Sequence, residues 1–175
     1  MNDDLHLRYP VGKFSPKESY STTELSQYID EIENLPAEVQ KITNALSTQQ
    51  LDKTYRDGGW TARQVLHHLA DSHMNAYVRF KWTLTEERPM IKAYDEKGWA
   101  ETPETKLDPT LSIQLLNALH KKWTSLLRRL DAAALERKFI HPDTKLEIPL
   151  SRMIATYAWH GQHHLGHIRI VENKV

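Results

Sequence analysis

Apolar residues recur at helical spacing in four long stretches of the chain. The first stretch follows Ser21, which forms an S-x-x-E capping box with Glu24. Its apolar positions are Leu25, Tyr28, Ile29, Ile32, Leu35, Val39, Ile42 and Leu46. Pro36 lies inside this stripe. Because proline has no N–H to donate, we expect a kink or a restart of the helix at that point.

The next two stretches also carry start signals. Thr61 and Gln64 form a second capping box, and we expect a helix from there to about Glu87, because Pro89 prevents a longer one. Asp108-Pro109 is a typical helix start, with an aspartate cap before a proline. The third stripe is the most regular, with Leu115, Leu116, Leu119, Trp123, Leu126, Leu127 and Leu130.

The fourth helix is predicted from Ser151 to Glu172. Short β-prone runs around residues 138–148 predict a small hairpin before it. Residues 88–107 show no period, which is typical of a lid or a crossover, and residues 1–20 are predicted to form an extended arm. The pattern predicts an all-α fold, a four-helix bundle in a single domain over residues 1–175 with long crossover loops.

Composition narrows the class of protein. Of 175 residues, 39% are hydrophobic and 26% charged, which is typical of a folded soluble domain. No apolar stretch is long enough to cross a membrane, and the first 16 residues lack the apolar core of a signal peptide, so we expect a cytoplasmic protein. Lys plus Arg and Asp plus Glu both number 23, and zero net charge argues against nucleic-acid binding.

The chain has no cysteine and ten histidines. The absence of cysteine excludes disulfides, cysteine nucleophiles and cysteine-ligated zinc. Any metal site must therefore use imidazole, carboxylate and water.

The last helix carries the strongest chemical signal. On a helical wheel, His160 and His164 fall in the same sector as Met153, Tyr157 and Ile168, which should face the core. Residues four apart are neighbours on a helix, so H-x-x-x-H presents two nitrogens to one cation. The alternative is that both are core histidines bonded to the backbone. Gly161 stands where H-E-x-x-H peptidases have their catalytic glutamate, which argues against that class.

The second helix offers His67, His68 and His73 as a further ligand. Its apolar face is centred nearest His73, while His68 lies on a polar flank and His67 points away from both. Periodicity alone does not decide whether that flank is a metal site or a solvated face.

Several segments together resemble the DinB/YfiT-like superfamily, and within it the YfiT-like branch of metal-dependent hydrolases of Bacillus-type bacteria. The segments are Arg8-Tyr9-Pro10-Val11-Gly12, Tyr55-Arg56-Asp57-Gly58-Gly59-Trp60-Thr61, residues 67–73, Tyr94-Asp95-Glu96-Lys97, and residues 159–168. The resemblance covers nearly the whole chain. It implies a four-helix bundle that holds one divalent metal ion on His68, His160 and His164, and a cytoplasmic homodimer.

Other polar residues receive weaker assignments. We expect His73 to be a core histidine bonded to a neighbour, and His163 and His167 to be candidates for contacts around the metal ligands. Arg56 and Asp57 are read as a structural turn beside Gly58-Gly59. The five tryptophans are expected to be packing groups, and the acidic residues of the long loop (Asp95, Glu96, Glu101 and Glu104) to be solvated.

Three imidazoles leave a coordination position open, as in catalytic zinc sites, and this favours hydrolysis of a small-molecule substrate by activated water. Zn²⁺ is the expected ion, with Ni²⁺, Mn²⁺ and Fe²⁺ as alternatives. The resemblance also allows a metal-dependent S-transferase that activates a low-molecular-weight thiol such as bacillithiol. A non-catalytic metal-binding stress-response module is the third reading. No catalytic base is assigned; His163, His167, Asp57 and Asp71 qualify by residue type.

Overall fold

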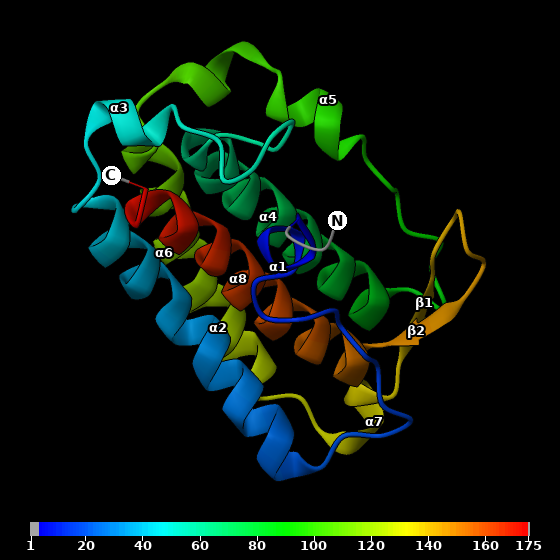
Figure 1. Cartoon of the computed structure of the whole chain (residues 1–175). Helices are drawn as coiled ribbons and strands as arrows, with labels where there is room; N and C mark the ends of the chain where they lie inside the picture. Colours follow the sequence, from blue (N-terminus) through cyan, green and yellow to red (C-terminus); the bar gives the residue numbers. More distant parts are fainter. Residues whose placement is uncertain (1–3, 175) are drawn as a thin grey trace.

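The computed structural model describes residues 4–174 and shows the predicted all-α four-helix bundle (Figure 1). The long helices are α2 (Thr22–Thr43), α4 (Ala62–Thr85), α6 (Thr110–Leu127) and α8 (Leu150–Glu172). Both predicted capping boxes are present. Ser21 Oγ accepts from the Glu24 N–H at 3.2 Å, and Thr61 Oγ1 accepts from the Gln64 N–H at 3.1 Å. The local start signals therefore fix where α2 and α4 begin.

Shorter elements connect the bundle. They are α1 (Asp4–Arg8), α3 (Thr48–Leu51), α5 (Glu96–Ala100), the 3-10 helix η1 (Pro103–Lys106), α7 (Ala132–Leu135), β1 (Lys138–Ile140) and β2 (Glu147–Pro149). The two strands pair antiparallel, with Phe139 opposite Ile148, which confirms the predicted hairpin.

Two boundaries differ from the sequence prediction. The arm expected to be extended over residues 1–20 contains helix α1, because its first proline, Pro10, comes after one helical turn has closed. Helix α6 begins at Thr110, slightly after the predicted start, so Pro109 and not Asp108 stands at the N-cap. Asp108 Oδ1 still accepts from the Thr110 N–H at 2.9 Å.

Helix α2 runs through Pro36 as one continuous helix, so of the two predicted outcomes, a kink or a restart, the restart does not occur. Proline costs a helix the hydrogen bond that its N–H would donate to the carbonyl four residues earlier, which here belongs to Ile32. Ile32 and Pro36 are both buried. The lost donor therefore leaves a buried carbonyl that needs another partner.

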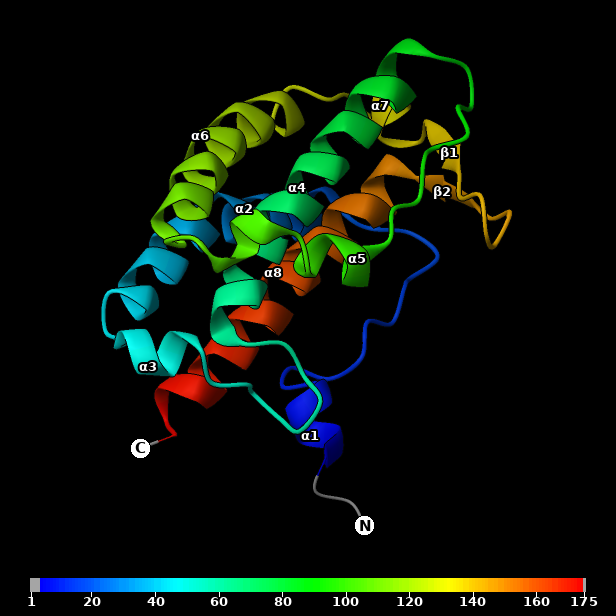
Figure 2. The same ribbon diagram turned by 90° about the horizontal axis from the view of Figure 1, so that it is seen from above.

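Each long helix packs against two others. Helices α2 and α4 both contact α6 and α8, so α2 lies diagonally from α4 (Figures 1 and 2). Helices α4 and α6 run in the same direction, opposite to α2 and α8. Residues 86–109 must therefore return along the bundle between α4 and α6, and they carry α5 and η1 past α4. This segment is the predicted crossover.

The apolar core has two halves. One half, toward the hairpin, includes Ile32, Phe80, Trp123 and Leu150. The other, toward the C-terminus, includes Leu35, Leu66, Leu116 and Leu165. Histidines of α4, α6 and α8 come between the two halves along their helices: His73, His120 and His160. No helix among residues 4–174 is both long and apolar enough to cross a membrane.

Candidate metal centre

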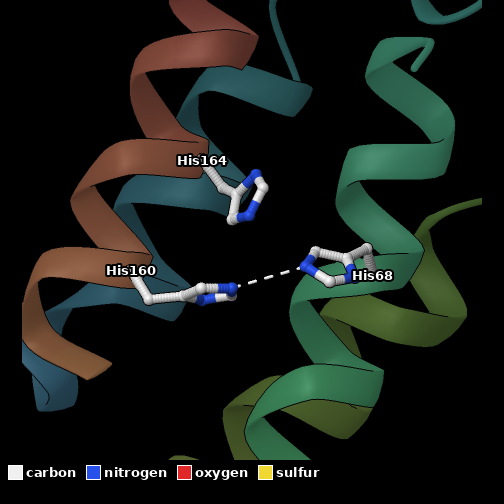
Figure 3. A group of neighbouring side chains, drawn as sticks. All are labelled: His68, His160 and His164. Atoms are coloured by element: carbon white, nitrogen blue, oxygen red, sulfur yellow. Dashed lines mark hydrogen bonds between the residues drawn. The ribbon is translucent and has the colours of Figure 1, made fainter. Parts of the chain in front are cut away.

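The three predicted ligands meet between α4 and α8. His68 projects from α4, and His160 and His164 project from successive turns of α8, so that the rings point into one shared space (Figure 3). One ring nitrogen of each residue lies within 4.8 Å of the other two. Nε2 of His68 and Nε2 of His160 are 3.3 Å apart.

This spacing suits a metal ion. Zinc–nitrogen bonds of about 2.0–2.1 Å at tetrahedral angles place two ligand nitrogens about 3.3–3.4 Å apart. His68 and His164 are 4% and 7% exposed, so both imidazoles are largely removed from bulk solvent. Imidazole nitrogens are ligands of intermediate softness, and Zn²⁺ and its neighbours in the first transition row prefer such ligands. The residues therefore fit a divalent metal.

All three imidazoles are held in the neutral form that a metal requires. Burial, with a smaller contribution from the nearby His163, lowers the pKa of His68 to about 4. Burial, followed by repulsion from neighbouring imidazoles, lowers the pKa of His160 and of His164 well below the ordinary value. Binding a cation at neutral pH would therefore displace no proton from an imidazolium.

A second histidine group adjoins the first. Nitrogens of His163, His164 and His167 also lie within 4.8 Å of one another, and the Nδ1 atoms of His164 and His167 are 3.3 Å apart. The two groups share His164. A neutral imidazole has a single lone pair to give, so His164 can serve as a neutral ligand in only one group at a time.

Aromatic rings enclose the histidines. The ring of Trp60 lies 4.7 Å from that of His68 and 6.4 Å from that of His164, and Tyr55 stacks on His167 at 3.9 Å. Trp60 also packs against the core half nearer the C-terminus. The expectation that it is a packing residue therefore describes only part of its position, since its ring also contacts two rings of the triad.

Two cavities reach the triad. A cavity of about 540 Å³ has His163, His164 and His167 in its wall, together with Arg56 and Lys97. A second cavity of about 280 Å³ has His160 in its wall and is lined further by Phe139 and Met153. The triad is thus reachable from two sides, and both carry positive charge, since Arg79 and Arg152 line the smaller cavity beside its apolar residues.

Glu96 lines both cavities. The sequence places it among solvated loop acids, and its side chain does reach solvent. It stands at the first position of α5, however, and partial burial raises the pKa of its carboxyl while Arg79 acts in the opposite direction. Only the path of the crossover over α4 brings this carboxylate to the cavities beside the triad, so hydrophobic periodicity could not have identified its position.

Other candidate bases lie elsewhere. Asp71, whose pKa burial raises to about 6, and Asp57 line neither of the two cavities beside the triad. Asp57 is exposed in the Gly58-Gly59 turn, where Arg56 donates to its main-chain carbonyl at 2.8 Å. This contact supports the structural reading of the turn.

His67 is buried, although the sequence placed it away from the helix's apolar face. Its Nδ1 lies 2.7 Å from Ser112 Oγ, and its Nε2 lies 3.3 Å from the Leu107 carbonyl. The start of α6 and the loop before it cover the outer side of α4 there. His67 therefore links the parallel helices α4 and α6 structurally, whereas the adjacent His68 is a candidate metal ligand.

His73 is fully buried and bonded to neighbouring histidines, as the core reading predicted. Its Nε2 lies 3.1 Å from His160 Nδ1, and its Nδ1 lies 2.8 Å from Nε2 of His120. His120 was missed because the third stripe was centred on leucines. The observed buried side is Ile113, Leu116, His120, Trp123 and Leu127, a spacing that could have revealed it.

The N-terminal arm covers the same face of α8. The carbonyl of Arg8 lies 3.3 Å from His167 Nε2, and the Gly12 carbonyl accepts from Trp159 Nε1 at 3.0 Å. The arm fits closely because Gly166 has no side chain: a Cβ there would come within 2.7 Å of Pro10. A Cβ at Gly161 would instead come within 2.6 Å of Leu35. Position 161 therefore faces α2 and could not place a base at the triad.

Comparison with known proteins agrees with this architecture. Residues 31–168 match the DinB superfamily model. The chain is 48% identical over 165 residues to the Bacillus subtilis (strain 168) protein named "Putative metal-dependent hydrolase YfiT", covering 94% of this chain and 93% of that one. It is also 48% identical over 175 residues to a Bacillus cereus (strain ZK / E33L) protein of the same descriptive name, covering 100% and 99%.

A solved structure gives the same result in three dimensions. It is that of YfiT from Bacillus subtilis, described as "a probable metal-dependent hydrolase with an unusual four-helix bundle topology". The two structures superpose with a TM-score of 0.93 at 48% identity, over 95% of this chain and 96% of that one. The matched family model spans most of the chain and the relatives span nearly all of it, so this protein belongs to the DinB superfamily.

Proposed function

We propose that this protein is a metal-dependent hydrolase whose divalent ion is held by His68, His160 and His164. The observation that carries the proposal is the convergence of three imidazoles, two buried and that of His160 half-buried, at metal-ligand spacing. A divalent ion with three such ligands and an open position would lower the pKa of a bound water toward neutrality and polarise a carbonyl. The names of the relatives support this reaction class.

The protein's own groups would then bind and orient the substrate. Arg56 and Lys97 in the larger cavity suit a small molecule with an anionic group. In the smaller cavity, Phe139 and Met153 suit its uncharged part, and Arg79 and Arg152 add positive charge beside them. Glu96, which lines both, would accept a proton from the attacking water at its carboxylate. Trp60 covers two of the ligand rings and limits access of bulk water.

Zn²⁺ is the ion we propose, with Ni²⁺, Mn²⁺ or Fe²⁺ able to occupy the same nitrogen set. The test is metal content by elemental mass spectrometry on untagged wild type and on His68→Ala, His160→Ala and His164→Ala. We expect about one ion per wild-type chain and a loss in each variant. An ester and amide panel should then show turnover that a chelator removes and added metal restores. A wild type without metal after reconstitution would overturn the proposal.

Thiol transfer is the second candidate, because the same open position could hold a thiolate. The chain has no cysteine, so a thiolate at the open position would have to come from a low-molecular-weight thiol. The cationic cavity fits a thiol that carries carboxylates, such as bacillithiol. Metal-dependent adduct formation from a thiol and an electrophile, without ester or amide hydrolysis, would assign this reaction. Metal binding without either reaction would leave a non-catalytic binding module.

Two further expectations belong to the same proposal. We propose a cytoplasmic homodimer, as the family resemblance implies. Light scattering on the purified chain would test the dimer, with a mass near twice 20.4 kDa expected. A monomer at micromolar concentration would remove it from the proposal.

A further inference from the structure

We infer that two hydrogen-bonded series of histidines, called files below, set the tautomers of His160 and His164. The first file is His120, His73 and His160, and the second is His167 and His164. Each file starts at a helix carbonyl that has no helical donor. His73, His120 and His167 are the positioning residues in these files. They keep the Nδ1 proton on each ligand and leave its Nε2 lone pair for the ion. The inference rests on the proposed metal site and adds residues that the metal does not touch.

The first file starts at α2. Pro36 leaves the carbonyl of Ile32 without its helical partner, and Nδ1 of His120 takes that place. A carbonyl only accepts, so Nδ1 of His120 must carry the proton. Its Nε2 then holds a lone pair, because burial keeps His120 neutral.

The tautomer of His120 determines which nitrogen donates at each following ring. Nε2 of His120 accepts, so Nδ1 of His73 donates to it across 2.8 Å. Nε2 of His73 then accepts from Nδ1 of His160 across 3.1 Å. His160 is left with an unprotonated Nε2, and this is the nitrogen 3.3 Å from His68. All four long helices take part, since Ile32, His73, His120 and His160 lie one on each.

The second file starts at the arm. Arg8 is the last residue of α1, and the final carbonyls of a helix have no intrahelical donor. His167 Nε2 donates to the Arg8 carbonyl across 3.3 Å, so its Nδ1 accepts. Nδ1 of His164, 3.3 Å away, is the donor, and Nε2 of His164 is left with the lone pair.

His68 is the ligand that no file controls. Its Nε2 faces the lone pair of His160, and without a cation it relieves that contact by carrying the proton itself. Binding a metal through Nε2 then requires His68 alone to move its proton to Nδ1. Two of the three ligands thus have the required tautomer before the ion binds, and metal loading changes the tautomer of His68 alone.

The experiment is long-range ¹H–¹⁵N correlation NMR of the side-chain imidazoles in the metal-free and zinc-loaded full chain at pH 7.5. Without metal, we expect His160 and His164 to be Nδ1–H tautomers and His68 to be the Nε2–H tautomer. With zinc, we expect only His68 to change. Nε2–H at His160 or His164 in the metal-free protein would overturn the inference.

Variants test the positioning role. His120→Leu removes the first file's donor to Ile32, and we expect His160 to become a tautomer mixture and zinc affinity to fall roughly 10- to 100-fold. His120→Gln retains both an N–H donor and an oxygen acceptor, and it should restore the His160 tautomer and bring affinity within about threefold of wild type.

His67→Leu is the matched control, because His67 is also buried and bonded to a carbonyl but belongs to neither file. We expect it to lower stability and leave both tautomers unchanged. Equal losses of affinity in His67→Leu and His120→Leu would show that His120 acts only through packing, which overturns the inference. The NMR result on the metal-free chain stands whether or not hydrolysis is found, so failure of the proposed function is separately visible.

Discussion

Pro36 removes the helical donor of the Ile32 carbonyl, and His120 of another helix supplies the missing hydrogen bond. A residue that weakens α2 locally thereby creates the acceptor from which the first histidine file starts. The same relationship explains how α2 tolerates proline in its interior. The buried carbonyl is satisfied from outside the helix, so the usual cost of an orphaned acceptor does not arise.

Pro36→Ala tests this relationship. Alanine returns an N–H that competes with His120 for the Ile32 carbonyl, and it favours a helix interior by up to about 3 kcal/mol relative to proline. We expect the free energy of unfolding of the metal-free protein to rise while zinc affinity falls. Urea denaturation and zinc titration measure the two quantities. If stability and affinity rose together, the carbonyl would have no part in ordering the ligands.

The shared residue His164 allows the two histidine groups to be distinguished. Because it has one lone pair, an ion on His68, His160 and His164 leaves the group of His163 and His167 unfilled. We expect His68→Ala to lose zinc and His163→Ala to retain about one zinc per chain. Elemental mass spectrometry decides between them. The reverse pattern would move the ion to the second group on α8.

Acid should destabilise the metal-free protein through its buried imidazoles. Burial lowers the pKa of His120 to about 4, while the Ile32 carbonyl raises it slightly; the unfolded value is about 6.5. The unfolded state therefore binds a proton first, and stability falls as pH decreases from about 6.5 to about 4. The contribution of this one group is on the order of 3 kcal/mol.

Urea denaturation at a series of pH values measures this slope. His120→Gln removes one titrating group, so its curve should be shallower than that of wild type by up to about 1.4 kcal/mol per pH unit in this window. Parallel curves for the two proteins would mean that His120 titrates normally in the folded state.

The close contact of Gly166 with Pro10 predicts a specific role for the arm. Gly166→Ala should improve helix propensity by up to about 1 kcal/mol, yet its Cβ would displace Pro10 and draw the Arg8 carbonyl away from His167. We expect faster proteolysis of residues before Ser21 and several-fold weaker zinc binding. Gly161→Ala is the control, since its Cβ meets Leu35 in the bundle and should lower stability without freeing the arm.

Glu96→Gln tests the proposed proton acceptor. The amide keeps the shape of the side chain but cannot take a proton, so we expect kcat to fall about 10²- to 10⁴-fold with metal content unchanged. Glu87→Gln changes an exposed carboxylate at the start of the crossover, and this control should leave kcat unchanged. A variant at position 96 with full turnover would assign the base elsewhere.

Local signals predicted most of the fold. Capping boxes at Ser21 and Thr61 and the apolar stripes placed the four long helices, because short-range hydrogen bonds and helical periodicity are properties of neighbouring residues. His160 and His164 were found the same way. His68 was chosen through family resemblance, since its polar flank looked like solvated surface until the crossover and Trp60 covered it.

Long-range contacts were beyond such signals. Glu96 lines the cavities beside the triad because residues 86–109 return along the bundle, and His167 meets Arg8 across 159 residues of sequence. His120 is the intermediate case. Its position on the buried side of α6 is readable from spacing, but its partners on α2 and α4 are not.

The polar layer between the two halves of the core has a consequence for how the helices align lengthwise. Leucines on α6 could pack against their neighbours one turn higher or lower with little loss, because apolar contacts are not directional. Such a slip would part His120 from Ile32 and His73 and leave buried nitrogens unpaired, at about 1–3 kcal/mol each. The polar layer therefore fixes the axial alignment of the four helices. Apolar residues on either side of it can vary in size without changing that alignment.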